Sequence, residues 1–125
     1  LRTSDVVSLH VRLTEQSRGM IGRRELSLMK PGALLINTAR GAIVDHAARA
    51  AAFSSGKLAG AALEVQEGER PDLAKPPYSD PRVIVTPHAA FVSVESLANL
   101  RSRTARQVAV RLTGGVPENV VNGIQ

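Results

Sequence analysis

Apolar and polar positions come in separate blocks along this chain, and the blocks predict strands that alternate with helices. "DVVSLHV" at residues 5–11 is rich in β-branched residues and predicts a strand. "ALLINTA" at residues 33–39 predicts a second strand that is apolar on both faces, as expected where helices cover both sides of a sheet. "LAGAALEV" at residues 58–65 and "VIVT" at residues 83–86 predict a third and a fourth strand.

The segments between these strands carry helix start and stop signals. "RRELSLMK" at residues 23–30 predicts a helix that a Pro-Gly pair closes. Asp45 can cap a second helix that runs to about Ser55. Ser93 can cap a last helix with a broad apolar stripe, which ends at the glycine pair that begins with Gly114. The connection at residues 66–82 is long and holds four prolines, and loops of this length are more often functional than not.

This alternation indicates an α/β fold, a Rossmann-like parallel sheet with covering helices. Ligands bind to such sheets outside the carboxyl ends of the strands, where loops and helix starts converge. Arg40 follows the second strand, Glu67 and Glu69 follow the third, and His88 follows the fourth. We therefore expect an arginine, a carboxylate and a histidine at one edge of the sheet.

These three residue types are suited to binding and reducing an anionic carbonyl compound. A guanidinium such as that of Arg40 can hold a carboxylate through two parallel hydrogen bonds. A histidine such as His88 exchanges protons near neutral pH, and a carboxylate on its second ring nitrogen favours the imidazolium. Taken singly, each residue also has a plain structural interpretation, as a surface arginine, a loop histidine or a solvated glutamate.

Composition narrows the classes of function that this sequence can serve. The 125 residues carry a formal charge of +5, but the basic residues are scattered and aromatics make up only 2%, and both facts argue against a nucleic-acid partner. No cysteine is present, which excludes disulfides, and no metal-ligand spacing occurs. No apolar run is long enough to span a membrane and no signal peptide is recognisable, so we expect a cytoplasmic protein without a membrane partner.

Several motifs resemble those of one enzyme family. "SDVVSLHVRLTEQSRGMIGRRELSLMKPGALLINTARGAIVD", "GKLAGAALEVQEGERP" and "VIVTPHAAF" are similar to the signature segments of the NAD-dependent D-isomer-specific 2-hydroxyacid dehydrogenases. The resemblance runs from about Ser4 to Asn122, and the combination of "KPGALLINTARG" with "TPHAA" is highly specific. Within the family, "TPHAAF" followed by "SVESLANLRSRTARQVAVRLTGGVPENVVN" is similar to the branch that contains phosphoglycerate dehydrogenase-like enzymes and C-terminal-binding-protein corepressors.

The resemblance implies a role for each candidate residue. Arg40 matches the substrate-binding arginine, His88 the acid/base histidine, and Glu69 the carboxylate that pairs with this histidine. The cofactor, NAD with NADP not excluded, is expected beside six residues at the strand ends: His10, Val11, Thr14, Thr38, Ala39 and Glu64. The implied reaction is hydride transfer between NADH and a small 2-oxo acid.

The sequence also departs from the family pattern. Glu64 stands where the family usually has aspartate, close to the nicotinamide, and Arg49 stands where a helix usually has leucine. An arginine on an otherwise apolar helix face is hard to bury.

The resemblance further implies a division of the chain. Residues 1–113 correspond to the second half of a nucleotide-binding domain, and residues 114–125 to a tail that returns toward a separate substrate domain. The glycine-rich pyrophosphate turn of the family is expected before residue 1. The first strand then becomes an apolar sheet edge, which predicts a homo-oligomer. The alternative function is a non-catalytic, corepressor-like binding or assembly module on the same half-fold.

Overall fold

The structure is a computed structural model, and it describes residues 1–66, 68 and 71–121 of the chain. These residues form two compact units, Leu1–Ala90 and Phe91–Gln125, and each unit is described by itself. The first unit contains all the strands among the described residues, whereas the second contains one long helix. The predicted division between residues 113 and 114 stays a prediction.

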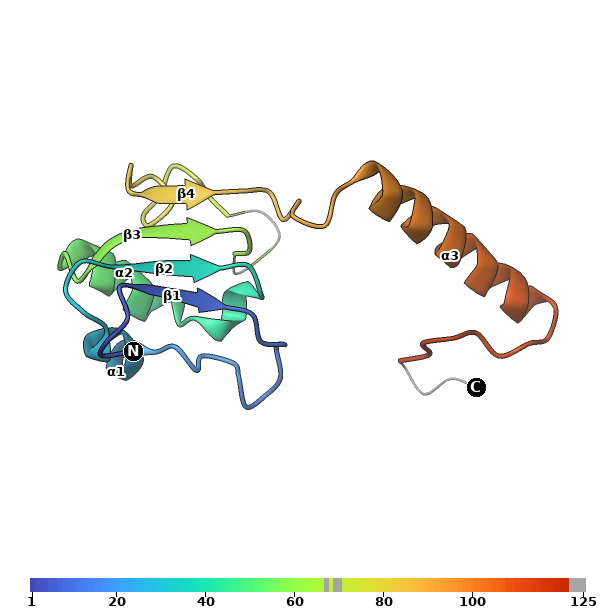
Figure 1. Cartoon of the computed structure of the whole chain (residues 1–125), viewed down its shortest axis with the longest axis horizontal. Coiled ribbons are helices and arrows are strands. Elements are labelled where there is room, and N and C mark those ends of the chain that lie inside the picture. The colour runs from blue at the N-terminus through green and yellow to red at the C-terminus, as the bar shows by residue number, and fades with distance from the viewer. Residues whose placement is uncertain (67, 69–70, 122–125) are drawn as a thin grey trace. The chain divides into compact units, whose positions relative to one another are not determined.

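Four parallel strands form the sheet of the first unit. They are β1 (Val6–Leu9), β2 (Ala33–Asn37), β3 (Leu58–Leu63) and β4 (Val83–Val85), and they lie side by side in the order β1-β2-β3-β4 (Figure 1). The predicted α/β fold with a parallel sheet is therefore confirmed. Each strand ends earlier than its apolar run, so the last residues of the four runs belong to the loops at the carboxyl edge.

Short helices connect the first three strands. Helix α1 (Arg23–Leu28) ends two residues before the predicted stop, and a 3-10 turn, η1 (Gly41–Ile43), precedes helix α2 (His46–Ser54). Asp45 caps α2 as predicted, because its carboxylate accepts a hydrogen bond of 2.7 Å from the backbone N–H of Ala48. Gly56, with φ of +72°, follows the helix in the left-handed conformation that glycine adopts without strain.

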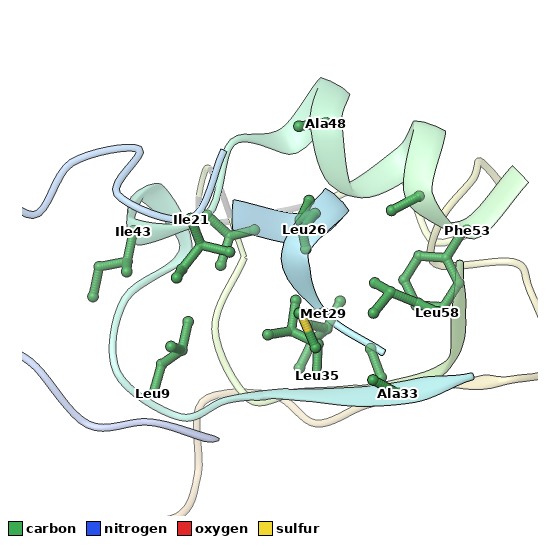
Figure 2. Close-up of a cluster of buried hydrophobic side chains, with 14 residues drawn as sticks. Leu9, Ile21, Leu26, Met29, Ala33, Leu35, Ile43, Ala48, Phe53 and Leu58 are labelled. Carbon is green, nitrogen blue, oxygen red and sulfur yellow. The ribbon is translucent and has the colours of Figure 1, made fainter. Parts of the chain in front are cut away.

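The hydrophobic core lies between the sheet and these two helices, on one face of the sheet (Figure 2). Each successive strand is added on the same side of the previous one, and right-handed crossovers then place α1 and α2 on the same face. The buried core side chains are those of Leu9, Ile21, Leu26, Met29, Ala33, Leu35, Ile43, Val44, Ala48, Ala52, Phe53, Leu58, Ala61 and Leu63.

The opposite face of the sheet is not covered by the described residues of this unit. Val6, Leu34 and Ile84 on that face are 48%, 41% and 65% exposed. The expectation that helices cover the second strand on both faces is therefore wrong for the unit Leu1–Ala90, because its two helices share one face. β1 pairs only with β2 and forms a sheet edge, as expected.

Arg49 of α2 is buried, with only 1% of its surface exposed, although an arginine on an apolar helix face is hard to bury. The loop at residues 71–82 supplies the reason through Tyr78. An Nη atom of Arg49 donates a hydrogen bond of 3.2 Å to the Tyr78 hydroxyl, and the guanidinium carbon lies 5.6 Å from the centre of the tyrosine ring. The Nε atom of Arg49 has no hydrogen-bond partner among the described residues. Tyr78 thus accommodates the buried cation without neutralising it.

The second unit contains helix α3 (Val94–Leu112), which begins at the predicted cap. The Ser93 hydroxyl accepts a hydrogen bond of 3.0 Å from the backbone N–H of Ser96, and the Ser96 hydroxyl bonds back to the N–H of Ser93. The apolar residues of α3 remain solvent-accessible, with Val94 and Leu112 each 82% exposed. Across the described ranges, none of the helices is long and apolar enough to cross a bilayer.

Candidate active site

Arg40 and His88 line one hollow at the carboxyl edge of the sheet. The arrowheads in Figure 1 mark the carboxyl ends of the strands. Arg40 arrives three residues after β2, and His88 arrives three residues after β4. The hollow has a volume of about 760 Å³, and the residues that line it are Arg40, Gly41, Val65, Gln66, Gly68, Pro71, Leu73, Val85, Thr86, Pro87 and His88. The structure therefore brings together two of the three residues that the sequence predicted to act on a substrate.

The third residue, Glu69, lies outside the described residues, so its proposed pairing with His88 stays a prediction. Gly68 and Pro71, on either side of it, both line the hollow.

A buried asparagine shapes the turn that carries Arg40. Asn37, the last residue of β2, is fully buried, and its side-chain N–H donates a hydrogen bond of 3.0 Å to the carbonyl of Arg40. Its side-chain oxygen accepts a hydrogen bond of 3.1 Å from the N–H of Ala39. Sequence analysis missed this role, although a polar residue inside an apolar strand was a signal for it.

The guanidinium of Arg40 is exposed. One of its Nη atoms donates a hydrogen bond of 2.7 Å to the carbonyl of Ala39. No described carboxylate lies within ion-pair distance of Arg40. Donors on this group thus remain available for a bidentate contact with a bound carboxylate.

His88 occupies a backbone conformation that is uncommon for a residue with a side chain. Its φ is +55°, in the left-handed region, and it lies in the middle of the turn formed by residues 86–90. Such a conformation disfavours the turn by about 1 kcal/mol or more, and it persists only where the surroundings hold it. Strain of this kind is concentrated at functional sites, which agrees with the acid/base role expected of His88.

Glu64 lies immediately after β3, is only 7% exposed, and binds both ends of this turn. The Thr86 hydroxyl donates a hydrogen bond to Oε2 of Glu64, and the N–H of Ala90 donates one to Oε1. The bond from Thr86 and then that from Ala90 hold the pKa of Glu64 below its ordinary value. Glu64 is thus a buried carboxylate whose charged form is favoured by its neighbours.

Gln66 is a second polar link at this edge that sequence analysis missed. Its side-chain N–H donates a hydrogen bond of 3.0 Å to the carbonyl of Leu63 and another of 3.4 Å to the carbonyl of Thr86. Gln66 therefore ties the end of β3 to the end of β4, and its position in a polar loop gave no signal of this.

A second hollow, of about 420 Å³, opens beside the first at the ends of β1 and β2. Four of the six residues predicted to contact the cofactor line it: His10, Val11, Thr38 and Ala39. The Ser8 hydroxyl lies 2.8 Å from Nε2 of His10, and the Thr38 hydroxyl lies 3.3 Å from Nδ1. Arg40 lines this hollow as well, so its side chain is shared by both hollows.

The other two predicted cofactor residues do not line this hollow. Thr14 belongs to a turn at residues 14–17, where its N–H donates a hydrogen bond of 2.8 Å to the Ser17 hydroxyl. Glu64 faces the turn of His88, as described above. The sequence gave no way to separate these two from the other four.

The second hollow fits part of a dinucleotide. The imidazole of His10 and the hydroxyl of Thr38 suit the hydroxyl groups of a ribose. Its volume is large enough for one portion of the molecule rather than for the whole. Within the described ranges, no group of three or more His, Asp or Glu side chains could hold a metal ion.

A parallel sheet with an arginine and a histidine in one hollow at its carboxyl edge is the arrangement expected of a Rossmann-like nucleotide-binding domain. Comparison with known proteins specifies the family. Residues 1–90 match the model of the D-isomer specific 2-hydroxyacid dehydrogenases in its NAD-binding domain, and the chain belongs to this family. The family, the fold and NAD as the cofactor of this domain are thereby confirmed, and named relatives of the chain are oxidoreductases.

A curated relative and two solved structures illustrate the similarity. The glyoxylate reductase of Aeropyrum pernix is 41% identical over 122 residues, which are 98% of this chain and 36% of the relative. The D-isomer specific 2-hydroxyacid dehydrogenase of Xanthobacter autotrophicus is 33% identical with a TM-score of 0.87, over 97% of this chain and 40% of that one. The D-lactate dehydrogenase of Aquifex aeolicus, complexed with NAD and lactic acid, is 37% identical with a TM-score of 0.80, over 91% and 39%.

The chain thus spans well under half the length of the curated relative and of both solved structures.

Proposed function

We propose that this chain provides the catalytic edge of an NAD-dependent dehydrogenase that interconverts a small 2-oxo acid and its D-2-hydroxy acid. The observation that carries the proposal is the shared hollow of Arg40 and His88, beside a second hollow suited to a dinucleotide. The names of the relatives, glyoxylate reductase and D-lactate dehydrogenase, support a substrate of two or three carbon atoms.

In this mechanism each residue has one task. Arg40 binds the substrate carboxylate through two hydrogen bonds and so fixes the direction of the neighbouring carbonyl. His88 donates a proton to the carbonyl oxygen during reduction and removes it during oxidation. Glu69 is proposed to hold the second ring nitrogen of His88. When bound, NADH supplies the hydride.

The proposed cofactor groove comprises two sets of residues. His10, Val11, Thr38 and Ala39 form its wall in the second hollow. Thr14 and Glu64 are proposed as neighbours of the same groove on the strength of the family resemblance. A homo-oligomeric assembly and a cytoplasmic location also remain proposals.

The test follows NADH oxidation by the full-length gene product with glyoxylate, pyruvate and hydroxypyruvate. We expect His88→Ala to lower kcat by about 100-fold or more, because general acid catalysis contributes about that much. We expect Arg40→Lys to raise the KM for the acid by about tenfold or more, since an ammonium cannot form the bidentate contact. Arg101→Lys on α3 is the matched control and should leave both constants unchanged.

Turnover that survives in the His88→Ala variant would refute the mechanism. A gene product that binds NADH but reduces no 2-oxo acid would instead favour the alternative, a non-catalytic binding or assembly module.

A further inference from the structure

The carboxylate of Glu64 spans the turn that carries His88. Its two oxygens bind opposite ends of the turn, Oε2 at Thr86 and Oε1 at Ala90, and His88 lies midway between these two residues. Both bonds come from groups in a single turn of five residues, so the carboxylate links the two ends of this turn.

The position of Glu64 in the fold makes it a firm anchor. Its own N–H donates a hydrogen bond of 3.0 Å to the carbonyl of Asn37, the residue that shapes the Arg40 turn. The N–H of Thr86 in turn donates a hydrogen bond of 3.1 Å to the carbonyl of Leu63. Glu64 thus connects the backbone beside Arg40 with the turn of His88.

The electrostatics of the site agree with this link. The positive charge of His88 is one of the influences that keep the pKa of Glu64 low, after the hydrogen bonds from Thr86 and Ala90. A carboxylate that stays charged accepts both hydrogen bonds at neutral pH, and such charge-assisted bonds are stronger than neutral ones.

We propose that Glu64 is a positioning residue that holds His88 against the substrate by fixing the turn at residues 86–90. The left-handed backbone of His88 needs such support, since without it the turn relaxes toward a conformation that aims the imidazole elsewhere. This inference rests on the proposed function, because it concerns the placement of the proposed acid/base group.

The length of the side chain is the decisive property. Aspartate, the residue that the family usually has at this position, is shorter than glutamate by one methylene, about 1.5 Å, so both hydrogen bonds lengthen unless the backbone moves. Glutamine has the full length, and it can accept from the N–H of Ala90 while it donates to the Thr86 hydroxyl. Glu64→Asp therefore tests the length of the side chain, and Glu64→Gln tests its charge.

The experiment compares Glu64→Asp and Glu64→Gln in the full-length gene product. We expect Glu64→Asp to lower kcat by about tenfold or more, since a displacement of about 1 Å at a reacting group has effects of this size or larger. Glu64→Gln should retain more of kcat than Glu64→Asp.

One further readout, the amide resonance of Ala90, is independent of turnover. In the parent protein the amide resonance of Ala90 should titrate with the carboxyl of Glu64, at a pH below the ordinary pKa of glutamate, and Glu64→Asp should shift this resonance. If the Glu64 variants fail to fold, Thr86→Val and Thr86→Ser provide the test. The valine removes one anchor and should lower kcat, whereas the serine keeps the hydroxyl and should restore it.

The inference would be overturned by a Glu64→Asp variant in which neither kcat nor the Kd for NADH changes. It would also be overturned by a variant with an unchanged kcat and a raised Kd for NADH. The latter result would show that the carboxylate serves the cofactor directly. A His88→Ala variant that keeps its turnover would refute the proposed function, whereas the Ala90 amide would still show whether Glu64 holds the turn.

Discussion

Arg49 offers a sharp test of how this domain tolerates a buried charge. Its guanidinium is buried, makes one hydrogen bond to Tyr78, and has an Nε atom without a partner among the described residues. No described carboxylate pairs with it. We predict that Arg49→Met, which keeps the length of the side chain and removes the charge, does not destabilise the protein.

The magnitude follows from opposing contributions. The change removes an unsatisfied buried donor, which opposes folding by about 1–3 kcal/mol, and the desolvation of a cation, which opposes it by several kcal/mol. It also loses a charged hydrogen bond of about 1.5–3 kcal/mol and a cation–π contact of up to about 2 kcal/mol. Tyr78 is half-buried, so its hydroxyl can bond to water in the variant. We expect the free energy of unfolding to rise by about 0–2 kcal/mol.

Urea unfolding of the full-length gene product, followed by circular dichroism, measures this change. Arg49→Ala is the control for volume, and its free energy of unfolding should fall by about 2–5 kcal/mol because it leaves a cavity. A decrease of more than about 1 kcal/mol for Arg49→Met, with an unchanged m value, would refute the reasoning. That result would mean that the guanidinium has a stabilising partner.

Two further predictions concern pH and association. The side chain and the backbone N–H of Arg82 donate hydrogen bonds to the carboxylate of Asp80, the shortest of them 2.6 Å long. These bonds lower the pKa of Asp80 from its ordinary 3.8 to about 2. The stability that this pair contributes is therefore present above pH 3.8 and is lost as the pH falls through about 2. In urea unfolding, the free energy of unfolding of the parent should exceed that of Asp80→Asn at pH 5, and the two values should converge near pH 2. The 125-residue chain alone should self-associate through the exposed sheet face. In analytical ultracentrifugation, the double variant Leu34→Lys, Ile84→Lys should sediment as a smaller species than the parent chain. A parent chain that sediments as a monomer would contradict this prediction.

The order and type of the elements could be predicted because each depends on local patterns. The apolar runs predicted the four strands, and the side chains of Asp45 and Ser93 predicted where α2 and α3 begin. Arg40 and His88 were predicted at one edge because parallel strands deliver the residues that follow them to the same side.

The features that could not be predicted depend on contacts between distant segments. The sequence of α2 does not reveal that Tyr78 of a later loop covers Arg49, nor that Glu64 reaches across to Thr86 and Ala90. The exposed face of β2 was missed for a related reason. An apolar run shows that a strand can be buried on both faces. It does not show whether this portion of the chain contains helices for both faces.

The regular strand order has a consequence for how the domain is made. Each strand pairs with the one that precedes it in the chain, so every pairing closes a local loop rather than a distant one. Folding during synthesis can therefore proceed strand by strand from the N-terminal side, with β4 joining last in this unit. Because His88 follows β4, we expect the hollow that it shares with Arg40 to be completed only at that final step, so that a nascent chain has no working site until its sheet is assembled.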